Sequence, residues 1–165
     1  VTAVDRSPAR LGRVRQNLAR LGLAAEIVAA DALAWRPAAL ADAVLLDAPC
    51  SATGTIRRHP DIPHLKSQAD VEKLAVLQSR LLEAAATMLK PGGTLVYCTC
   101  SLQTEEGEAQ AALALQFGLE PMPISAGELG LDDDMVRNGQ LRTLPYHWAA
   151  QGGMDGFFAA RFRRA

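Results

Sequence analysis

Two cysteine-containing stretches hold the residues best suited to chemistry. Asp47-Ala48-Pro49-Cys50 brings a carboxylate, a rigid proline and a thiol together, and the small residues that follow it, 51–55, allow another backbone to approach closely. Thr99-Cys100-Ser101 places a second thiol at the exit of an expected strand, where reactive residues collect. In a reducing compartment, free thiols at such positions are available for chemistry. The alternative for Cys50 is a buried, hydrophobe-like side chain in a tight turn.

The third cysteine is interpreted as structural. Cys98 lies two residues before Cys100 and therefore shares its face of the strand, where a side chain packs into the covering layer. A zinc site built from the cysteines and His59 is not expected, because no Cys-x-x-Cys pair or matching histidine spacing is present. We therefore predict no bound metal.

Three aspartates each close a short apolar run: Asp5, Asp31 and Asp47. In parallel α/β sheets, ligands bind beyond the carboxyl ends of the strands, so these acids are expected to converge on one edge. Asp5 either binds the hydroxyl groups of a ribose or caps the following helix. Asp31 either accepts a hydrogen bond from an adenine amino group or starts a turn. The sequence by itself leaves both questions open.

Local start and stop signals define the elements that must position these residues. Ser7-Pro8 begins a helix that Gly22 ends, and Ser67 with Asp70 begins a long helix that Lys90-Pro91-Gly92-Gly93 ends. Thr104 is expected to cap another helix, which extends to about Phe117. Residues 48–66 and 125–153 are expected to be loops, the second with short pieces of structure. The predicted strands are residues 1–4, 25–30, 43–46, 94–99, 119–124 and 154–162.

Strands that alternate with helices of this length predict an α/β fold, with a mostly parallel sheet and helices on both faces. A chain of 165 residues is long enough for one domain, so residues 1–165 are expected to form a single one. The chain opens at Val1 with residues that already have the pattern of a strand. We therefore expect an N-terminally truncated domain.

Composition excludes several classes of protein. With 49% hydrophobic and 21% charged residues, the chain is neither disordered nor collagen-like, and no apolar run is long enough for a membrane span. An odd number of cysteines argues against a disulfide framework and favours the reducing cytoplasm. The net charge of −1 does not by itself indicate a nucleic-acid binder. The arginines near the start of the chain are interpreted as the solvated face of a helix.

The sequence resembles the Sun/Fmu family of RNA 5-methylcytosine methyltransferases, in particular the bacterial enzymes that act on 16S ribosomal RNA. The resemblance depends on DAPCSATGTIRRHPDI and on KPGGTLVYCTCSLQTEEGE, whose Pro-Cys and Thr-Cys loops lie some fifty residues apart. The opening VTAVDRSPARLGRVRQNLARLGL and the closing GGMDGFFAARF also match, so the resemblance extends from end to end. It implies a Rossmann-like class I fold that uses S-adenosylmethionine.

The resemblance assigns a role to each candidate residue. Cys100 matches the nucleophile that adds to carbon 6 of the cytosine, and Cys50 matches the second cysteine, which helps to release the product. Asp47 matches the acid beside the target base and the methionine end of the cofactor. Asp5 matches the acid that holds the cofactor ribose, and Asp31 the acid beside its adenine.

Because carbon 6 is unreachable in a stacked helix, the target cytosine must be single-stranded or flipped out. We expect Arg57, Arg58 and His59, just beyond the Pro-Cys loop, to hold phosphates of the RNA substrate.

The sequence departs from the family in three respects. Ala52 stands where glycine is usual, and the first strand with its glycine-rich turn and the N-terminal RNA-binding extension are missing. Weak or absent cofactor binding is therefore expected for these 165 residues alone.

Two alternatives are kept. In the first, Cys50 is the nucleophile, as in DNA cytosine-5 methyltransferases. In the second, the chain is a catalytically silent RNA-binding module of the same fold.

Overall fold

The first 38 residues form a strand, a helix and a second strand, as the local sequence signals predict. The computed structural model describes all 165 residues, in two units that comprise residues 1–38 and 39–165. In the first unit, β1 (Thr2–Asp5) and β2 (Glu26–Ala29) pair in parallel and are connected by α1 (Pro8–Leu21). The Ser7 hydroxyl accepts a hydrogen bond from the Arg10 backbone, and Gly22 ends the helix in the left-handed conformation at a φ of 65°.

The five arginines between residues 6 and 20 confirm the solvated helix face. All five are exposed: Arg6, Arg10, Arg13, Arg15 and Arg20.

The second unit is built around a six-stranded sheet in which β3 (Ala41–Asp47), β4 (Leu89–Thr99) and β8 (Phe157–Arg164) are successive neighbours. The sheet continues from β8 through β7 (Gln140–Thr143) to β6 (Val136–Arg137), and β5 (Leu119–Pro121) also pairs with β8.

The direction of the strands differs from the predicted, mostly parallel sheet. β3 and β4 pair in parallel, but every pairing of β5, β6, β7 and β8 is antiparallel. The reason is the connection into β8: the chain returns from β7 through residues 144–156, which hold only one short 3-10 helix and no crossover α-helix. β3 forms one end of this sheet, with a single strand neighbour.

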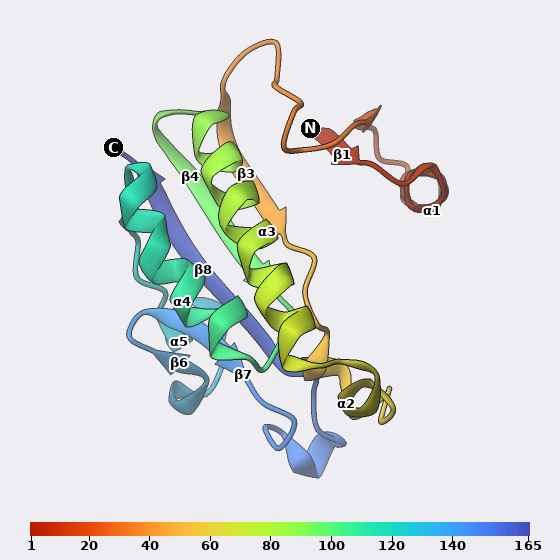
Figure 1. Ribbon diagram of the computed structural model, residues 1–165, viewed down its shortest axis with the longest axis vertical. Coiled ribbons are helices and arrows are strands. Elements are labelled where there is room, and N and C mark those ends of the chain that lie inside the picture. Colours follow the sequence, from red (N-terminus) through yellow and green to blue (C-terminus); the bar gives the residue numbers. More distant parts are fainter. The chain divides into compact units, whose positions relative to one another are not determined.

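Two helices cover one face of the sheet. Figure 1 shows α3 (Gln68–Thr87) and α4 (Glu108–Leu113) side by side over β4 and β8. The capping box predicted at the start of α3 is present, since Ser67 accepts from the Asp70 backbone and Asp70 accepts from the Ser67 backbone. The largest fully buried side chains of the core between helices and sheet are Leu82, Leu89, Leu95, Tyr97, Leu119, Phe158 and Phe162.

Two segments differ from the sequence prediction. The helix expected over residues 104–117 is broken into a 3-10 turn at Thr104–Glu106, α4, and a second 3-10 turn at Ala114–Phe117. Thr104 does not cap it, because its hydroxyl contacts Glu105 instead. β4 begins at Leu89, five residues early, across a register irregularity opposite Ala41 and Ala43.

The two predicted loops contain more structure than expected. Residues 48–66 include a 3-10 turn at Thr53–Thr55 and α2 (Ile62–Leu65), and residues 125–153 include α5 (Ala126–Leu129) as well as β6 and β7. Further 3-10 turns lie at Asp133–Met135 and Ala149–Gln151. The helices are all too short or too polar to cross a membrane.

Candidate active site

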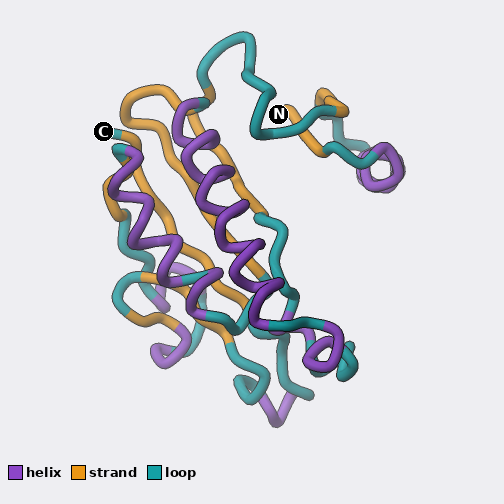
Figure 2. The backbone as a smooth tube through the Cα atoms, in the orientation of Figure 1, coloured by secondary structure: helices purple, strands orange, loops and turns teal.

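Two neighbouring parallel strands deliver the Pro-Cys and Thr-Cys loops to the same end of the sheet. Asp47, the last residue of β3, pairs with Cys98, the penultimate residue of β4. Figure 2 shows loops and short helices gathered at this end, next to α2. The Sγ atoms of Cys50 and Cys100 are 3.5 Å apart, although fifty residues separate them in the sequence. The structure therefore brings the two predicted thiols together on the same side of the sheet.

The backbones of the two loops touch at a glycine. The Gly54 amide donates to the Cys100 carbonyl at 2.9 Å, and the Gly156 amide donates to the Gly54 carbonyl at 2.7 Å. A Cβ atom at Gly54 would lie 1.9 Å from the Gly156 oxygen, which leaves no room for any side chain. The close backbone approach predicted for residues 51–55 is confirmed at this residue.

The two thiols differ in acidity. The hydrogen bond from Cys50 is the largest influence on Cys100 and lowers the pKa of the Cys100 thiol to about 7, against the opposing effects of burial and of Asp47. The same hydrogen bond, together with burial, raises the pKa of Cys50 far above its usual range. Near neutral pH, Cys100 is thus the thiol of the pair that ionises first, with Cys50 as its thiol donor.

Cys98 is structural, as predicted. It is buried, its Sγ lies 3.9 Å from the Asp47 carboxylate, and burial with this neighbouring charge raises the pKa of Cys98 to about 12. A thiol with such a pKa is protonated at neutral pH and is a poor nucleophile.

Asp47 is exposed at the tip of β3. Its charge acts on both Cys98 and Cys100, so the carboxylate lies within electrostatic reach of the reactive thiol. An exposed carboxylate beside a half-buried thiolate is free to bind a group that enters the site from solvent.

The basic residues beyond the Pro-Cys loop are already partly paired. Arg58 donates two hydrogen bonds to Asp155, at 2.8 Å and 2.5 Å, and Arg57 lies 3.8 Å from the same carboxylate. His59 is exposed, and its charge also acts on Asp155. Two arginines share one carboxylate, so this surface keeps a positive excess. Arg58 also lies within electrostatic reach of Cys100.

The acids of the first unit sit at adjacent strand ends. Asp5 ends β1, opposite Ala29 of β2, and its carboxylate accepts from the Ser7 backbone and from the Arg10 guanidinium, which lowers the pKa of Asp5. Asp31 is exposed and accepts from the Leu33 backbone, so it starts a turn.

Carboxylates at the carboxyl ends of parallel strands are the acceptors that cofactor ribose and adenine groups need, so these residues fit the implied cofactor. At Asp5, a diol would have to displace the exposed Arg10.

Sequence reasoning missed two buried charged residues that hold the loops. Glu106 accepts hydrogen bonds from both cysteine loops. Arg142 of β7 donates to the Ser101 carbonyl at 2.5 Å, pairs with Glu108 and stacks over the Phe158 ring at 4.8 Å. One signal was available: the cysteine loops are rich in hydroxyl residues, among them Ser51, Thr53 and Ser101, which together indicate a shared polar partner.

Comparison with known proteins places this geometry in a family. The sequence profile described as 16S rRNA methyltransferase RsmB/F matches residues 1–163. The chain belongs to this RsmB/F family. The predicted resemblance to the Sun/Fmu methyltransferases is thereby confirmed.

A relative and two solved structures extend the comparison. The "Ribosomal RNA small subunit methyltransferase B" of Pseudomonas syringae pv. tomato is 46% identical over 166 residues, which cover 98% of this chain and 36% of the relative. The structure described as "Crystal Structure of PH0851" matches with a TM-score of 0.83 and 29% identity, over 99% of this chain and 36% of that one.

NSun6 from Pyrococcus horikoshii, solved with SFG, matches with a TM-score of 0.78 and 30% identity, over 99% of this chain and 41% of that one. These matches confirm the Rossmann-like α/β fold predicted from the sequence. The chain spans little more than a third of the length of the RsmB/F relative.

Proposed function

We propose that this chain is the catalytic part of an S-adenosylmethionine-dependent methyltransferase that methylates carbon 5 of a cytosine in RNA, with 16S ribosomal RNA as the substrate. The observation that carries the proposal is the 3.5 Å approach of the Cys50 and Cys100 sulfur atoms at adjacent strand ends, in a member of the RsmB/F family. A cytoplasmic location and the absence of a bound metal stay predictions from the sequence.

Cys100 is the proposed nucleophile. Its lowered pKa supports this choice, because the thiolate is the attacking form and Cys100 carries more of it at neutral pH than Cys50. The Cys100 sulfur forms a bond to carbon 6 of the cytosine while Asp47 holds a proton at ring nitrogen 3. The electron pair of the former 5,6 double bond then makes carbon 5 nucleophilic.

When bound, S-adenosylmethionine supplies the methyl group that carbon 5 takes. Asp5 and Asp31 are proposed to hold the cofactor ribose and adenine, and Asp47 to lie beside its methionine end. Once a base has taken the proton from carbon 5, its electron pair re-forms the 5,6 double bond, the bond between Cys100 and carbon 6 breaks with its electrons returning to sulfur, and the ring regains its aromaticity. Cys50 is in hydrogen-bond contact with the departing sulfur, so we assign it to product release.

The phosphates of the RNA are proposed to bind Arg57, Arg58 and His59. Phosphate binding here competes with Asp155 for the guanidinium groups. Exposed ion pairs contribute little stability, so this competition is not prohibitive.

Trapping with 5-fluorocytosine RNA tests the nucleophile, because fluorine at carbon 5 cannot leave as a proton does and the covalent adduct persists. In the full-length gene product with S-adenosylmethionine present, we expect an adduct in the wild type and in Cys98→Ala, the matched control, but none in Cys100→Ala. An adduct in Cys100→Ala that is absent in Cys50→Ala would assign attack to Cys50, as in DNA cytosine-5 methyltransferases.

The catalytically silent RNA-binding module is the second candidate. It predicts RNA binding with no adduct in any variant. The two half-buried thiols in contact with each other, one with a lowered pKa, favour the enzyme.

A further inference from the structure

Glu106 is a fully buried carboxyl group beside the two cysteine loops. Burial of a carboxylate is costly unless hydrogen bonds replace its lost hydration. Its oxygens accept from the Ser51 backbone amide at 2.9 Å, from the Ser51 and Ser101 hydroxyls at 2.5 Å each, and from the Gln78 side-chain amide at 3.0 Å. Four donors therefore compensate the burial of this one side chain.

These donors come from three separate parts of the fold. Ser51 directly follows Cys50, Ser101 directly follows Cys100, and Gln78 lies on α3, where its amide also donates to the Pro49 carbonyl at 2.8 Å. Each of the two cysteines is thus followed in the sequence by a serine, and both serine hydroxyls donate to the Glu106 carboxylate.

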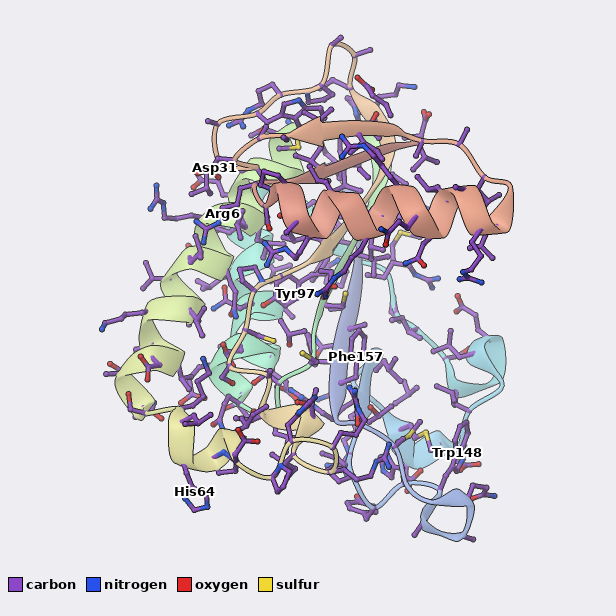
Figure 3. All side chains as sticks on the ribbon, turned by 90° about the vertical axis from the view of Figure 1, so that its right-hand side faces the viewer. Arg6, Asp31, His64, Tyr97, Trp148 and Phe157 are labelled. Atoms are coloured by element: carbon purple, nitrogen blue, oxygen red, sulfur yellow. The ribbon has the colours of Figure 1, made fainter.

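The backbone of Glu106 is anchored as well. The Tyr97 hydroxyl donates to the Glu106 carbonyl at 2.7 Å and the Thr99 hydroxyl at 3.2 Å. Tyr97 is buried in the interior of the molecule (Figure 3). The backbone of Glu106 is consequently tied to β4, the strand that leads into Cys100.

We propose that Glu106 is a positioning residue, which holds the Pro-Cys and Thr-Cys loops in register so that the Cys50 thiol donates its hydrogen bond to Cys100. The inference rests on the proposed function only for its catalytic consequence, because the thiol geometry exists without RNA or cofactor. Glu106 does not touch the reacting atoms.

The physical consequence is a dependence of Cys100 acidity on Glu106. A sulfur–sulfur hydrogen bond is weak and loses its strength when the loops separate. The other ionisable groups that act on Cys100 come from several elements: Asp47 at the end of β3, Cys98 on β4, Arg58 beyond the Pro-Cys loop, and Asp155 before β8. None of these groups hydrogen-bonds to Glu106, so its removal acts on Cys100 through the loops.

The pH profile of Cys100 alkylation measures this dependence. Iodoacetamide modification of Cys100 is followed by peptide mass spectrometry from pH 5 to 10 in the full-length gene product. We expect Glu106→Ala to move the midpoint of the profile upward by about 1.5 units, toward the value of a free cysteine. At pH 7 the thiolate fraction then falls about fifteenfold. The alkylation rate falls only about threefold, because a thiolate of higher pKa is intrinsically more reactive.

Two matched variants control the measurement. Glu106→Gln keeps the shape and one acceptor oxygen, and its new amide can donate to the serine hydroxyls, which rotate to accept, so it should restore most of the shift. Glu105→Ala removes the adjacent glutamate, which contacts only Gln68 and Thr104 through its side chain, and should leave the midpoint unchanged.

A double-mutant cycle identifies the route of action. In a Cys50→Ala background, where the thiol donor is already absent, Glu106→Ala should produce no further shift. An equal shift in both backgrounds, or no shift from Glu106→Ala in the wild-type background, would overturn the proposal. If Glu106→Ala does not fold, Ser101→Ala provides the same comparison, since it removes one tie between the carboxylate and the Cys100 loop.

Alkylation requires neither RNA nor S-adenosylmethionine. If 5-fluorocytosine RNA forms no covalent adduct but Glu106→Ala still shifts the alkylation midpoint, the result counts against the proposed function and not against the positioning role of Glu106.

Discussion

Substitution of Gly54 by alanine is predicted to separate the two cysteine loops. The added Cβ would lie 1.9 Å from the Gly156 oxygen and 2.9 Å from the Cys100 oxygen, and both obstacles are backbone atoms that no side-chain rotation can clear. Because an ordinary contact needs at least 3.4 Å, the Gly54 and Gly156 backbones must move apart by about 1.5 Å in this overpacked site.

That displacement breaks two hydrogen bonds, from Gly54 to Cys100 and from Gly156 to Gly54. Overpacking costs about 1–3 kcal/mol, and each lost backbone hydrogen bond costs about 1 kcal/mol more. We therefore expect the free energy of unfolding of residues 39–165 to fall by about 3–5 kcal/mol. With a urea slope of about 2 kcal/mol per molar, the unfolding midpoint falls by about 1.5–2.5 M.

Urea titration followed by Trp148 fluorescence checks this prediction. The chain has two tryptophans, so Trp35→Phe in every sample leaves Trp148, on the segment between β7 and β8 (Figure 3), as the only one. Gly127→Ala is the matched control, because no atom lies within 4 Å of its added Cβ. Its free energy of unfolding should change by less than about 0.5 kcal/mol, which leaves the urea midpoint nearly unchanged. Equal midpoints for Gly54→Ala and Gly127→Ala would refute the close approach of the two loops.

Three further predictions concern the thiols, the core and the basic surface. Mild oxidation should link Cys50 to Cys100 and leave Cys98 reduced, because only the first pair is in contact; peptide mapping of the oxidised chain checks this, and a Cys98-containing disulfide would contradict it. Tyr97→Phe should lower the free energy of unfolding by about 1 kcal/mol, since the Glu106 carbonyl loses one of its two hydroxyl donors; a urea midpoint equal to wild type would count against this contact. Arg57→Ala combined with Arg58→Ala should weaken RNA binding and reduce the slope of log affinity against log salt by about 1.4, as expected for two lost phosphate contacts on a single strand. An unchanged slope in a filter-binding titration would remove these arginines from the RNA surface.

The elements with local signals were predictable from the sequence. α1 begins and ends at its serine and glycine caps, and α3 begins at its capping box, because these contacts join residues no more than four positions apart. The two thiols were also placed correctly at one end of the sheet, since adjacent parallel strands must finish together.

Features that depend on distant contacts were not predictable in this way. β7 was read as loop because its buried position is occupied by Arg142, whose charge disrupts the usual alternation and is compensated by Glu108 from another helix. Glu106 looked like one of several glutamates at a helix start, because nothing near it in the sequence distinguishes a carboxylate that binds Ser51, fifty-five residues away. The convergence of Asp5 and Asp31 with Asp47 stays a prediction.

The position of β3 at the end of its sheet has a practical consequence for handling these 165 residues in isolation. One side of this strand presents amide and carbonyl groups without a strand partner, and Leu45 beside them is 72% exposed. An unpaired strand edge of this kind readily forms hydrogen bonds to a strand of another molecule. A concentrated solution of this 165-residue chain should accordingly aggregate and become turbid. Leu45→Lys should slow the rise in turbidity.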